Sequence, residues 1–400
     1  MHIIIYSGSQ NLNSLGATKS IDVMLVKNLV LNGCKVTWIG RGNISDPPCE
    51  YINLGKNKIG ELMYKIISKL RRMFFKIKIQ DILYEEFIYF DKRMASLIIS
   101  GRINVDNETI IIGRNSMSLN SFSEVKKRGG KTILHSQWMH PITQEKLLNS
   151  EFKKIGINSK AINQKRIKRQ LLEIDNVDLI WCISKLVKDS YISNGLKINK
   201  LIDLNLGVDF EKYSNVDKNL RSKNEFTVLF VGNVNPEKGV YVLLEAIKKT
   251  NIKNIKVIFN GAIPKYFKSI FDNKVKELHN KNINFVVSPG NPIKNYAAAS
   301  VFVLPSIHES FGLVVLEAMS AALPVIISDM VGAKDCVKEG VNGFVFKSGN
   351  SDELAQILCK FYKNPRLVEQ MGRQSSLIAK NFDWNIIVFE LLRLIRSLNK

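Results

Sequence analysis

The sequence predicts an α/β protein with two Rossmann-like domains, each built around a parallel sheet. Short runs of apolar residues alternate with amphipathic helical segments, which is the pattern of βαβ units. A polar stretch at 211–225 separates two series of such runs. The 400 residues are enough for two domains that each bury their own core.

The first series of apolar runs lies in the N-terminal half. A helix is expected between its first two strands, at 20–33, where apolar residues recur at helical spacing and Gly33 closes the last turn. The expected strands are HIIIYS (2–7), CKVTWIG (34–40), TIIIG (109–113), KTILHS (131–136) and LIWCIS (179–184).

The second series follows the stretch 211–225, which we predict to be a linker because it lacks the apolar residues that a core needs. The predicted domains are therefore 1–210 and 211–380, followed by a C-terminal helix within 381–400. The expected strands are FTVLFVG (226–232), IKVIFNG (255–261), NINFVVS (282–288), VFVLP (301–305) and PVIIS (324–328).

The segment 303–322, VLPSIHESFGLVVLEAMSAA, is the most informative part of the chain. It predicts a buried strand, a loop that carries Glu309, and the start of a helix that carries Glu317. The N-terminus of a helix has unpaired N–H groups and a partial positive charge, which favour a phosphate. Gly312 lets the backbone approach a ligand closely, and the two carboxylates can accept hydrogen bonds from hydroxyls. A phosphate together with a polyol predicts a nucleotide sugar.

This segment resembles the signature of the group 4 glycosyltransferases, a retaining family with the GT-B fold. The resemblance implies two Rossmann-like domains that face each other across a cleft, with the final helix crossing back to the first domain. The N-terminal half matches only in outline. The matching segments are Glu309-x7-Glu317 within PSIHESFGLVVLEAMSAALPVIISD, then VGNVNPEKGVYVLLEAI (231–247), FNGAIP (259–264) and VGAKDCVKEGVNGFVF (331–346), and more loosely NLGVD (205–209) and NFDW (381–384).

The resemblance implies roles for the residues of the second domain. Lys238, in NPEKG, would hold the donor diphosphate and stabilise the departing nucleotide. Asn233 stands where the family usually has an arginine, so it would donate a hydrogen bond without adding charge. Glu309 would contact hydroxyls of the transferred sugar, Glu317 would contact the ribose, and the loop Ser310-Phe311-Gly312-Leu313 would meet the phosphates.

Structural roles stay open for the same residues. Lys238 could be an exposed loop lysine, Glu309 a helix cap and Glu317 a residue of a helix surface. His308, which precedes Glu309, carries no predicted role.

In the first domain the resemblance points to Gly16 and His135. Gly16 would approach the diphosphate from the loop after the first strand, although the family's usual double glycine is absent here. His135 ends the run KTILHS, where the family often has a histidine near the acceptor. It could move a proton or hydrogen-bond the donor sugar, or it could be structural. Trp138 and His140 are further candidates to line the acceptor site.

The resemblance also implies the chemistry. A sugar would pass from a nucleotide diphosphate to an acceptor through an oxocarbenium-like state, with Glu309, Lys238 and His135 as the catalytic group. Positive groups aimed at the leaving diphosphate would supply the main stabilisation. Transfer would occur on the front face, with the leaving phosphate taking the acceptor proton. We expect no metal and no cofactor beyond the nucleotide sugar, because the family is generally metal-independent and no His, Cys and Asp residues show metal-ligand spacing.

The formal net charge of +22 is concentrated in short stretches. Residues 56–80 contain eight Lys or Arg residues against the single acid Glu61. Apolar residues recur at helical spacing within 59–78, so this basic amphipathic segment predicts contact with an anionic membrane surface. Each basic residue near such a surface contributes on the order of 1 kcal/mol. The alternative is a helix that packs on its own sheet with a solvated basic face.

These features predict a soluble, cytoplasmic protein associated with the inner face of the plasma membrane. The chain starts with a strand-like run, shows no apolar run of about 18 residues, and has five cysteines without paired spacing. The expected acceptor is a glycan or a lipid-linked molecule, in the synthesis of a surface polysaccharide such as O-antigen, capsule or lipopolysaccharide.

Two other functions are weighed against this one. A sequence pI of about 9.6 is compatible with nucleic-acid binding, but basic charge alone is not specific and we recognise no nucleic-acid module, so no such partner is expected. A GT-B relative that works as a nucleotide-sugar epimerase, or as a catalytically silent scaffold, is the main alternative. Asn233 favours it, whereas intact Glu309, Glu317 and Lys238 argue against it.

Overall fold

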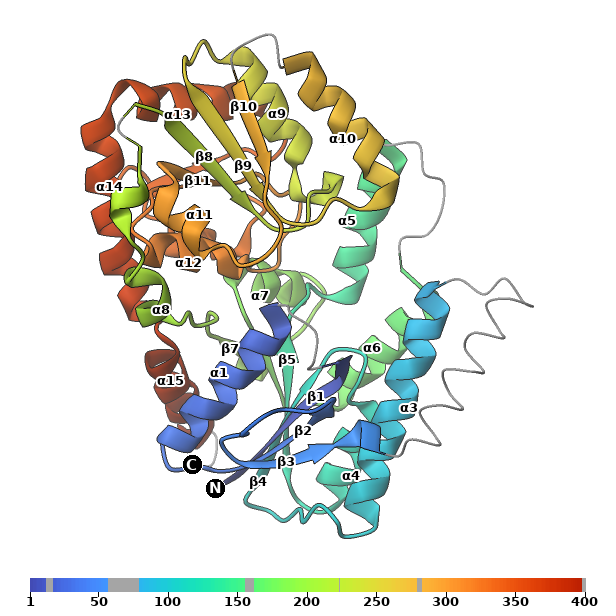
Figure 1. Ribbon diagram of the computed structural model, residues 1–400. Helices are drawn as coiled ribbons and strands as arrows, with labels where there is room; N and C mark the ends of the chain where they lie inside the picture. The colour runs from blue at the N-terminus through green and yellow to red at the C-terminus, as the bar shows by residue number, and fades with distance from the viewer. Residues whose placement is uncertain (12–16, 57–78, 155–161, 223, 279–282, 398–400) are drawn as a thin grey trace. The chain divides into compact units, whose positions relative to one another are not determined.

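The computed structural model describes residues 1–11, 17–56, 79–154, 162–222, 224–278 and 283–397 (Figure 1). The chain divides into two compact units. Unit 1 comprises Met1–Leu204 and Val388–Lys400, and unit 2 comprises Asn205–Ile387. The last helix therefore begins in unit 2 and ends in unit 1.

Unit 1 is built on a seven-stranded parallel sheet with the order β3-β2-β1-β4-β5-β6-β7. The central strand β4 is buried along its whole length, and the neighbouring β5 is buried except at Lys131, because helices cover both faces of the sheet. The strands are β1 (His2–Asn11), β2 (Lys35–Arg41), β3 (Glu50–Asn53), β4 (Thr109–Arg114), β5 (Lys131–Ser136), β6 (Leu179–Cys182) and β7 (Leu201–Asp203).

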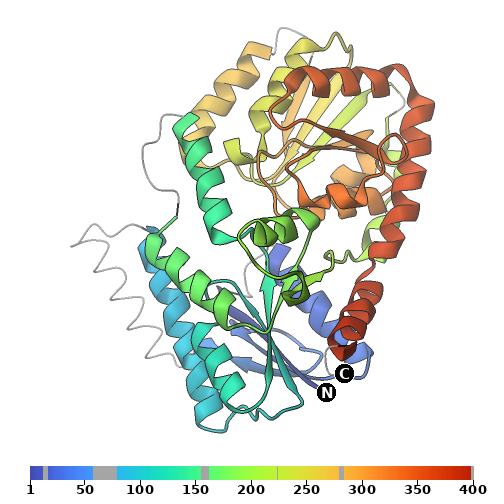
Figure 2. The same ribbon diagram turned by 180° about the vertical axis from the view of Figure 1, so that it is seen from behind.

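The helices of unit 1 form two layers around this sheet. Helix α4 packs between α3 and α6 on one face, and α1 lies on the opposite face (Figures 1 and 2). The helices are α1 (Ala17–Leu31), α3 (Ile79–Ile99), α4 (Leu119–Lys127), α5 (Pro141–Lys154), α6 (Gln164–Asn176), α7 (Lys185–Ile192) and α15 (Trp384–Ser397), with the 3-10 turns η1 (Leu54–Lys56) and η2 (Ile198–Lys200).

Unit 2 has a six-stranded parallel sheet with the order β10-β9-β8-β11-β12-β13. The strands are β8 (Phe226–Val231), β9 (Ile255–Asn260), β10 (Ile283–Val287), β11 (Val301–Leu304), β12 (Val325–Ser328) and β13 (Gly343–Phe346).

Helices cover both faces of the second sheet as well (Figures 1 and 2). Helix α9 packs against α10 and α13, whereas α12 packs against α8 and α14. These helices are α8 (Phe210–Ser214), α9 (Val240–Lys249), α10 (Lys265–Leu278), α11 (Ile293–Ala298), α12 (Leu313–Ser320), α13 (Ser351–Lys363) and α14 (Pro365–Ala379), with η3 (Lys218–Leu220), η4 (Pro236–Lys238), η6 (Gly332–Cys336) and η7 (Lys380–Phe382).

The structure confirms the predicted fold class of two parallel-sheet, Rossmann-like domains. All ten predicted strands are present within one or two residues of their predicted ends, except that β1 continues to Asn11. The prediction that 211–225 is a linker is wrong: most of helix α8 and the turn η3 lie in this stretch, within unit 2. The stretch is mostly polar, but its apolar residues Tyr213 and Val216 are buried and pack into the core of unit 2.

Candidate functional site

The loop after β8 in unit 2 carries Lys238. The side chain of Asn235 accepts a hydrogen bond from the Lys238 backbone N–H at 3.1 Å and so caps the turn η4. The next residue, Gly239, has a φ of +66°, and a Cβ there would lie 1.8 Å from the carbonyl oxygen of Pro305. Only glycine therefore lets this loop approach the loop after β11. The Ile307 N–H donates to the Glu237 carbonyl at 3.0 Å and joins the two loops.

Lys238 and Glu309 meet where these two loops run together. The Nζ of Lys238 donates to Oε2 of Glu309, and the two side chains keep 25% and 20% of their surface exposed. The Glu309 backbone is fixed in turn: its N–H donates to Met330 at 3.0 Å and its carbonyl accepts from Gly332 at 2.9 Å. The structure thus brings together two of the three predicted catalytic residues as one partly exposed ion pair.

The segment Ser310-Phe311-Gly312-Leu313 leads from Glu309 into helix α12. Phe311 is 2% exposed, and its carbonyl accepts a hydrogen bond from the Ala333 N–H at 2.7 Å. Gly312 has a φ of +90°, and a Cβ there would come within 3.0 Å of Leu304. The helix therefore begins directly beside Glu309, with its positive end toward the loop.

Glu317 lies on α12, where two tyrosine hydroxyls hydrogen-bond to its carboxylate. Its Oε2 accepts a hydrogen bond from the Tyr296 hydroxyl at 2.8 Å, and the Tyr213 hydroxyl also hydrogen-bonds to it. The two tyrosine rings meet edge to face at 5.7 Å. Burial raises the pKa of Glu317, and the two hydroxyls oppose that shift. The side chain is thus held by protein groups, and a surface role on the helix does not describe it.

Asn233 lies shortly before Lys238 in the chain, and His308 directly precedes Glu309. The Asn233 side chain is exposed, and its backbone carbonyl accepts from the Asn235 N–H at 3.0 Å. Asn233 follows Gly232, whose carbonyl oxygen would lie 1.9 Å from a Cβ on Gly261, so this loop also needs a glycine opposite it. Burial lowers the pKa of His308, which is half-buried.

The structure describes some of the predicted residues of unit 1 but not all of them. Gly16 and the basic segment 59–78 lie outside the described residues. His135 is 2% exposed on β5, and its ring stacks on Trp181 with centroids 4.2 Å apart. Burial, together with nearby Arg114, lowers the pKa of His135 well below its ordinary value. The imidazole is therefore neutral near pH 7 and suits a hydrogen bond better than a general-base role.

The two other candidates of unit 1 lie near the start of α5. The ring of His140 meets Tyr191 edge to face at 5.4 Å, and burial lowers the pKa of His140 to about 4. The ring of Trp138 lies under the guanidinium of Arg166, 4.3 Å from its centroid.

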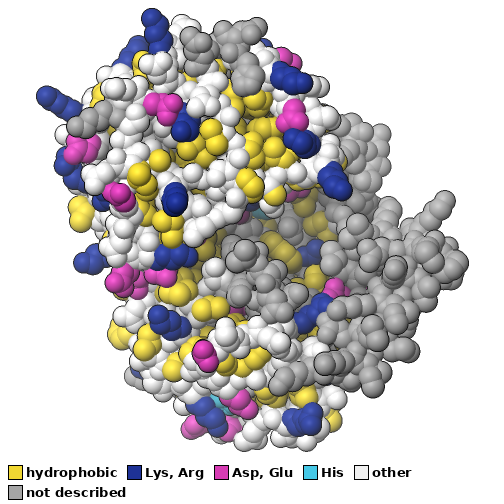
Figure 3. Space-filling view, viewed as in Figure 1, with side chains coloured by type: hydrophobic (Ala, Val, Ile, Leu, Met, Phe, Trp, Pro, Cys, Tyr) yellow, Lys and Arg dark blue, Asp and Glu magenta, His cyan; other side chains and the backbone are white. Residues whose placement is uncertain are grey.

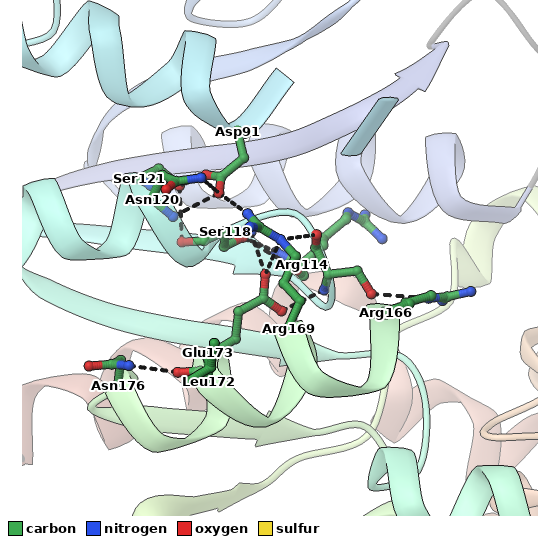
Figure 4. A network of polar contacts seen from close by, with 11 residues as sticks. Asp91, Arg114, Ser118, Asn120, Ser121, Arg166, Arg169, Leu172, Glu173 and Asn176 are labelled. Atoms are coloured by element: carbon green, nitrogen blue, oxygen red, sulfur yellow. Dashed lines mark hydrogen bonds and ion pairs between the residues drawn. The ribbon is translucent and has the colours of Figure 1, made fainter. Parts of the chain in front are cut away.

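A buried charge network follows strand β4, and the sequence did not point to it (Figure 4). Arg169 of α6 forms an ion pair with Asp91 of α3 and donates to the Ser116 carbonyl at 3.0 Å. Both oxygens of Glu173 accept backbone N–H groups, from Ser116 at 2.6 Å and from Ser118 at 2.9 Å. Burial raises the pKa of Glu173 to about 8. Arg169 and Glu173 are four residues apart, which in sequence is typical of an exposed helical ion pair.

The charged side chains on the surface form no single basic patch on the face shown in Figure 3. Lys and Arg are spread there over the described surface, with Asp and Glu among them. Among the described residues, no group of three or more His, Cys, Asp or Glu side chains is placed to hold a metal ion. No helix in the described part of the chain is long and apolar enough to cross a membrane.

Comparison with known proteins identifies the second unit. The family model for glycosyl transferases group 1 matches residues 212–377, which include Lys238, Glu309 and Glu317. Residues 212–377 are therefore similar to the group 1 glycosyltransferases. The family resemblance seen in the sequence is thereby confirmed.

Curated glycosyltransferases match just over half of the chain. The uncharacterized glycosyltransferase MJ1178 of Methanocaldococcus jannaschii is 30% identical over 230 residues, which cover 56% of this chain and 61% of that protein. The capsular polysaccharide biosynthesis glycosyltransferase CapM of Staphylococcus aureus is 28% identical over 232 residues, covering 53% of this chain and 60% of CapM. The chain thus spans about three fifths of the length of these relatives.

Solved glycosyltransferase structures share the fold along the whole chain. Sucrose-phosphate synthase from Thermosynechococcus elongatus superposes with a TM-score of 0.76 at 17% identity, covering 99% of this chain and 98% of that one. HepE of Anabaena, in complex with UDP, gives a TM-score of 0.70 at 16% identity and covers 99% and 100%. The fold is therefore GT-B, and the match to the group 1 glycosyltransferase model lies within its second unit.

Proposed function

We propose that the protein is a retaining glycosyltransferase that transfers a sugar from a nucleotide-diphosphate donor to a glycan or lipid-linked acceptor. The observation that carries the proposal is the Lys238–Glu309 pair, which lies at the N-terminus of α12 within the residues that match the group 1 glycosyltransferase model. A cation, a carboxylate and a helix N-terminus together match the phosphates and hydroxyls of a nucleotide sugar.

In the proposed mechanism the ion pair opens when the donor binds. Lys238 turns from Glu309 to the donor diphosphate, and Glu309 then accepts hydrogen bonds from sugar hydroxyls. Because both side chains are partly exposed, this exchange leaves neither charge buried without a partner. As the glycosidic bond breaks, negative charge grows on the diphosphate, and Lys238 and the N-terminus of α12 stabilise it. The leaving phosphate takes the proton of the acceptor hydroxyl.

Glu317 is proposed to bind the ribose, with Tyr296 and Tyr213 holding its carboxylate in place. The loop residues Ser310 to Leu313 are proposed to meet the phosphates, and Asn233 to donate a hydrogen bond there. His135 is proposed to hydrogen-bond a substrate as a neutral imidazole. The proposal needs no metal.

A uridine nucleotide is the first donor to test, because HepE of Anabaena is described in complex with UDP and with UDP-glucose. Synthesis of a surface polysaccharide is the proposed setting, since CapM is named for capsular polysaccharide biosynthesis. Cytoplasmic location and contact with an anionic membrane through the basic segment 59–78 remain part of the proposal.

Thermal unfolding with added nucleotides tests the donor site. UDP, GDP, ADP and their sugars are added in turn to the wild type and to Glu317→Ala. A ligand at about 100 times its dissociation constant adds roughly 2.7 kcal/mol to the native state. We expect one nucleotide to stabilise the wild type and to lose most of that effect in Glu317→Ala. Equal melting temperatures with and without every nucleotide would contradict a donor site.

A second assay separates the transferase from the epimerase. The nucleotide sugar that binds is incubated without acceptor, and its sugar is analysed. Conversion to an epimer in the absence of acceptor would favour the alternative, whereas an unchanged sugar that disappears only when a glycan acceptor is added supports transfer.

A further inference from the structure

A small hollow lies at the carboxyl end of strands β4 and β5 in unit 1. Arg114, Asn115, Met117, Gln137 and Trp138 line it, and the space in it that is open to the centre of a water-sized atom is about 10 Å³. This size admits a single oxygen atom of a ligand group, or one water molecule. In open α/β sheets, ligands bind outside the carboxyl ends of the strands, so the place itself suits a binding site.

Two buried hydrogen-bond donors at this hollow have no partner among the residues that the structure describes. Arg114 is 4% exposed, and its Nη1 makes no hydrogen bond, although its other terminal nitrogen pairs with Asp22. The amide Nε2 of Gln137 is likewise buried and without a hydrogen bond. A buried donor without an acceptor is unfavourable, and such groups call for an explanation. Both nitrogen atoms only donate, so their partner must be an acceptor, and the oxygens of a carboxylate or a phosphate are strong acceptors.

The neighbouring groups hold the two donors in place. The Asn115 side chain accepts from the Gln137 N–H at 3.2 Å and donates to the Ser136 hydroxyl at 3.3 Å, which ties the two loops together. Arg114 is the register partner of His135 on the adjacent strand, so the two side chains point to the same face of the sheet. Nε2 of His135 is also buried and has no hydrogen-bond partner in the described part of the chain.

The charges around the hollow favour an anion. Arg114, Arg166 and Arg169 lie near it or on the network beside it, and they face Asp22, Asp91 and Glu173. Among the described residues that line the hollow, Arg114 is the charged one, so the charge nearest to its space is positive.

We propose that Arg114 and Gln137 form a subsite for an oxyanion, a carboxylate or a phosphate, carried by the sugar acceptor. The proposal rests on the proposed transferase function, and it makes these two residues determinants of acceptor specificity. A guanidinium is suited to such groups because its planar N–H donors match their oxygens. His135 can hydrogen-bond a hydroxyl of the same sugar from the adjoining strand.

The test measures binding of three simple sugars to the full chain. Glucuronate carries a carboxylate, glucose 6-phosphate carries a phosphate, and glucose is the neutral control. We expect at least one acidic sugar to raise the melting temperature at concentrations at which glucose does not. Whichever of the two acts identifies the oxyanion. Equal effects of all three sugars, or none, would overturn the proposal and leave the hollow as a site for water.

Variants then locate the effect. Gln137→Met removes the amide donor with little change in side-chain length, and Arg114→Lys keeps a positive charge next to Asp22 but removes Nη1. We expect each to weaken acidic-sugar binding roughly tenfold, as the loss of a charge-assisted or buried hydrogen bond does. Gln170→Met is the matched control, since Gln170 is a buried glutamine of the same unit that does not line the hollow. Acidic-sugar binding equally sensitive to all three changes, or to none, would contradict the subsite.

UDP is titrated into the same samples, because this separates the two proposals. Stabilisation by UDP without any response to acidic sugars would refute the subsite and keep the transferase. Binding of acidic sugars that depends on Gln137, with no response to any nucleotide, would refute the donor site instead.

Discussion

The two units each carry an ion-pair system at the carboxyl ends of their strands, and the two systems differ in exposure. In unit 2, Lys238 and Glu309 are 25% and 20% exposed and form an ion pair with each other. In unit 1, Arg169 and Asp91 are 8% and 0% exposed and belong to a network that holds the backbone at Ser116 and Ser118. A partly exposed pair can exchange its partner for a ligand, whereas a buried network can only hold its loop.

The largest difference is expected in stability. Arg169→Met leaves the buried Asp91 without its cation, and removing one partner of a buried pair costs about 3–5 kcal/mol. Lys238→Met breaks a partly exposed pair and is expected to cost less than about 1 kcal/mol. Urea unfolding of the two variants compares them directly. Similar losses in both would mean that exposure does not distinguish the two systems.

The buried network should also make stability depend on pH. The pKa of Glu173 is about 8 in the folded protein, above the ordinary value of 4.5, so the folded state binds more protons between these values. Stability should therefore fall as pH rises through this window, by about 1.4 kcal/mol per pH unit at the steepest. Glu173→Gln cannot ionise, so the difference in unfolding free energy between variant and wild type should grow in the variant's favour from pH 5 to pH 8. Parallel curves would contradict the raised pKa.

The close approach of the two loops in unit 2 is expected to need Gly239. Gly239→Ala places a Cβ 1.8 Å from the Pro305 carbonyl and adds strain at a φ of +66°. We expect a loss of more than about 1 kcal/mol in stability together with weaker nucleotide binding. Gly340→Ala is the matched control, because Gly340 has a φ of +74° but open space around its Cβ position. Equal effects of the two changes would mean that backbone strain alone, and not the loop contact, matters.

The smallest expected effect concerns the support of Glu317. Tyr296→Phe removes the hydroxyl that donates to the carboxylate at 2.8 Å and leaves the ring in place. The expected loss is about 1 kcal/mol of stability, with a fewfold weaker affinity for a ribonucleotide. If Glu317 contacts the ribose, Tyr296→Phe should weaken the binding of a 2′-deoxynucleotide less than the binding of the ribonucleotide. Calorimetric titration with both nucleotides measures the two affinities. An affinity unchanged for both would separate Tyr296 from the donor site.

The sequence predicted every inner strand of both sheets and the edge strand β10, but it missed the other three edge strands. The three strands that it did not predict, β3, β7 and β13, are four, three and four residues long, and each lies at the end of its sheet. An edge strand pairs on one side only and is partly exposed, so its apolar pattern is short and incomplete. Residues 50–53, for example, are exposed or half-buried throughout.

The site was predictable where one local segment carried it. The strand, loop and helix at 301–320 contain Glu309, Gly312 and Glu317 in one stretch, so their chemistry could be inferred from spacing. The partners of these residues come from distant segments: Lys238 for Glu309, and Tyr213 and Tyr296 for Glu317. Asp91, Arg169 and the backbone after β4 also meet only through the fold. No spacing in one sequence reveals such pairs.

The most direct measurement is UDP- and UDP-glucose-induced stabilisation of the full chain in wild type, Lys238→Met and Lys249→Met. Lys249 is the control. It lies on α9, the helix that follows the Lys238 loop, and forms an ion pair with Asp352 of the same unit. The account predicts that the nucleotide stabilises the wild type and Lys249→Met alike and loses most of its effect in Lys238→Met. Undiminished stabilisation of Lys238→Met would contradict the claim that the Lys238–Glu309 pair is the donor site.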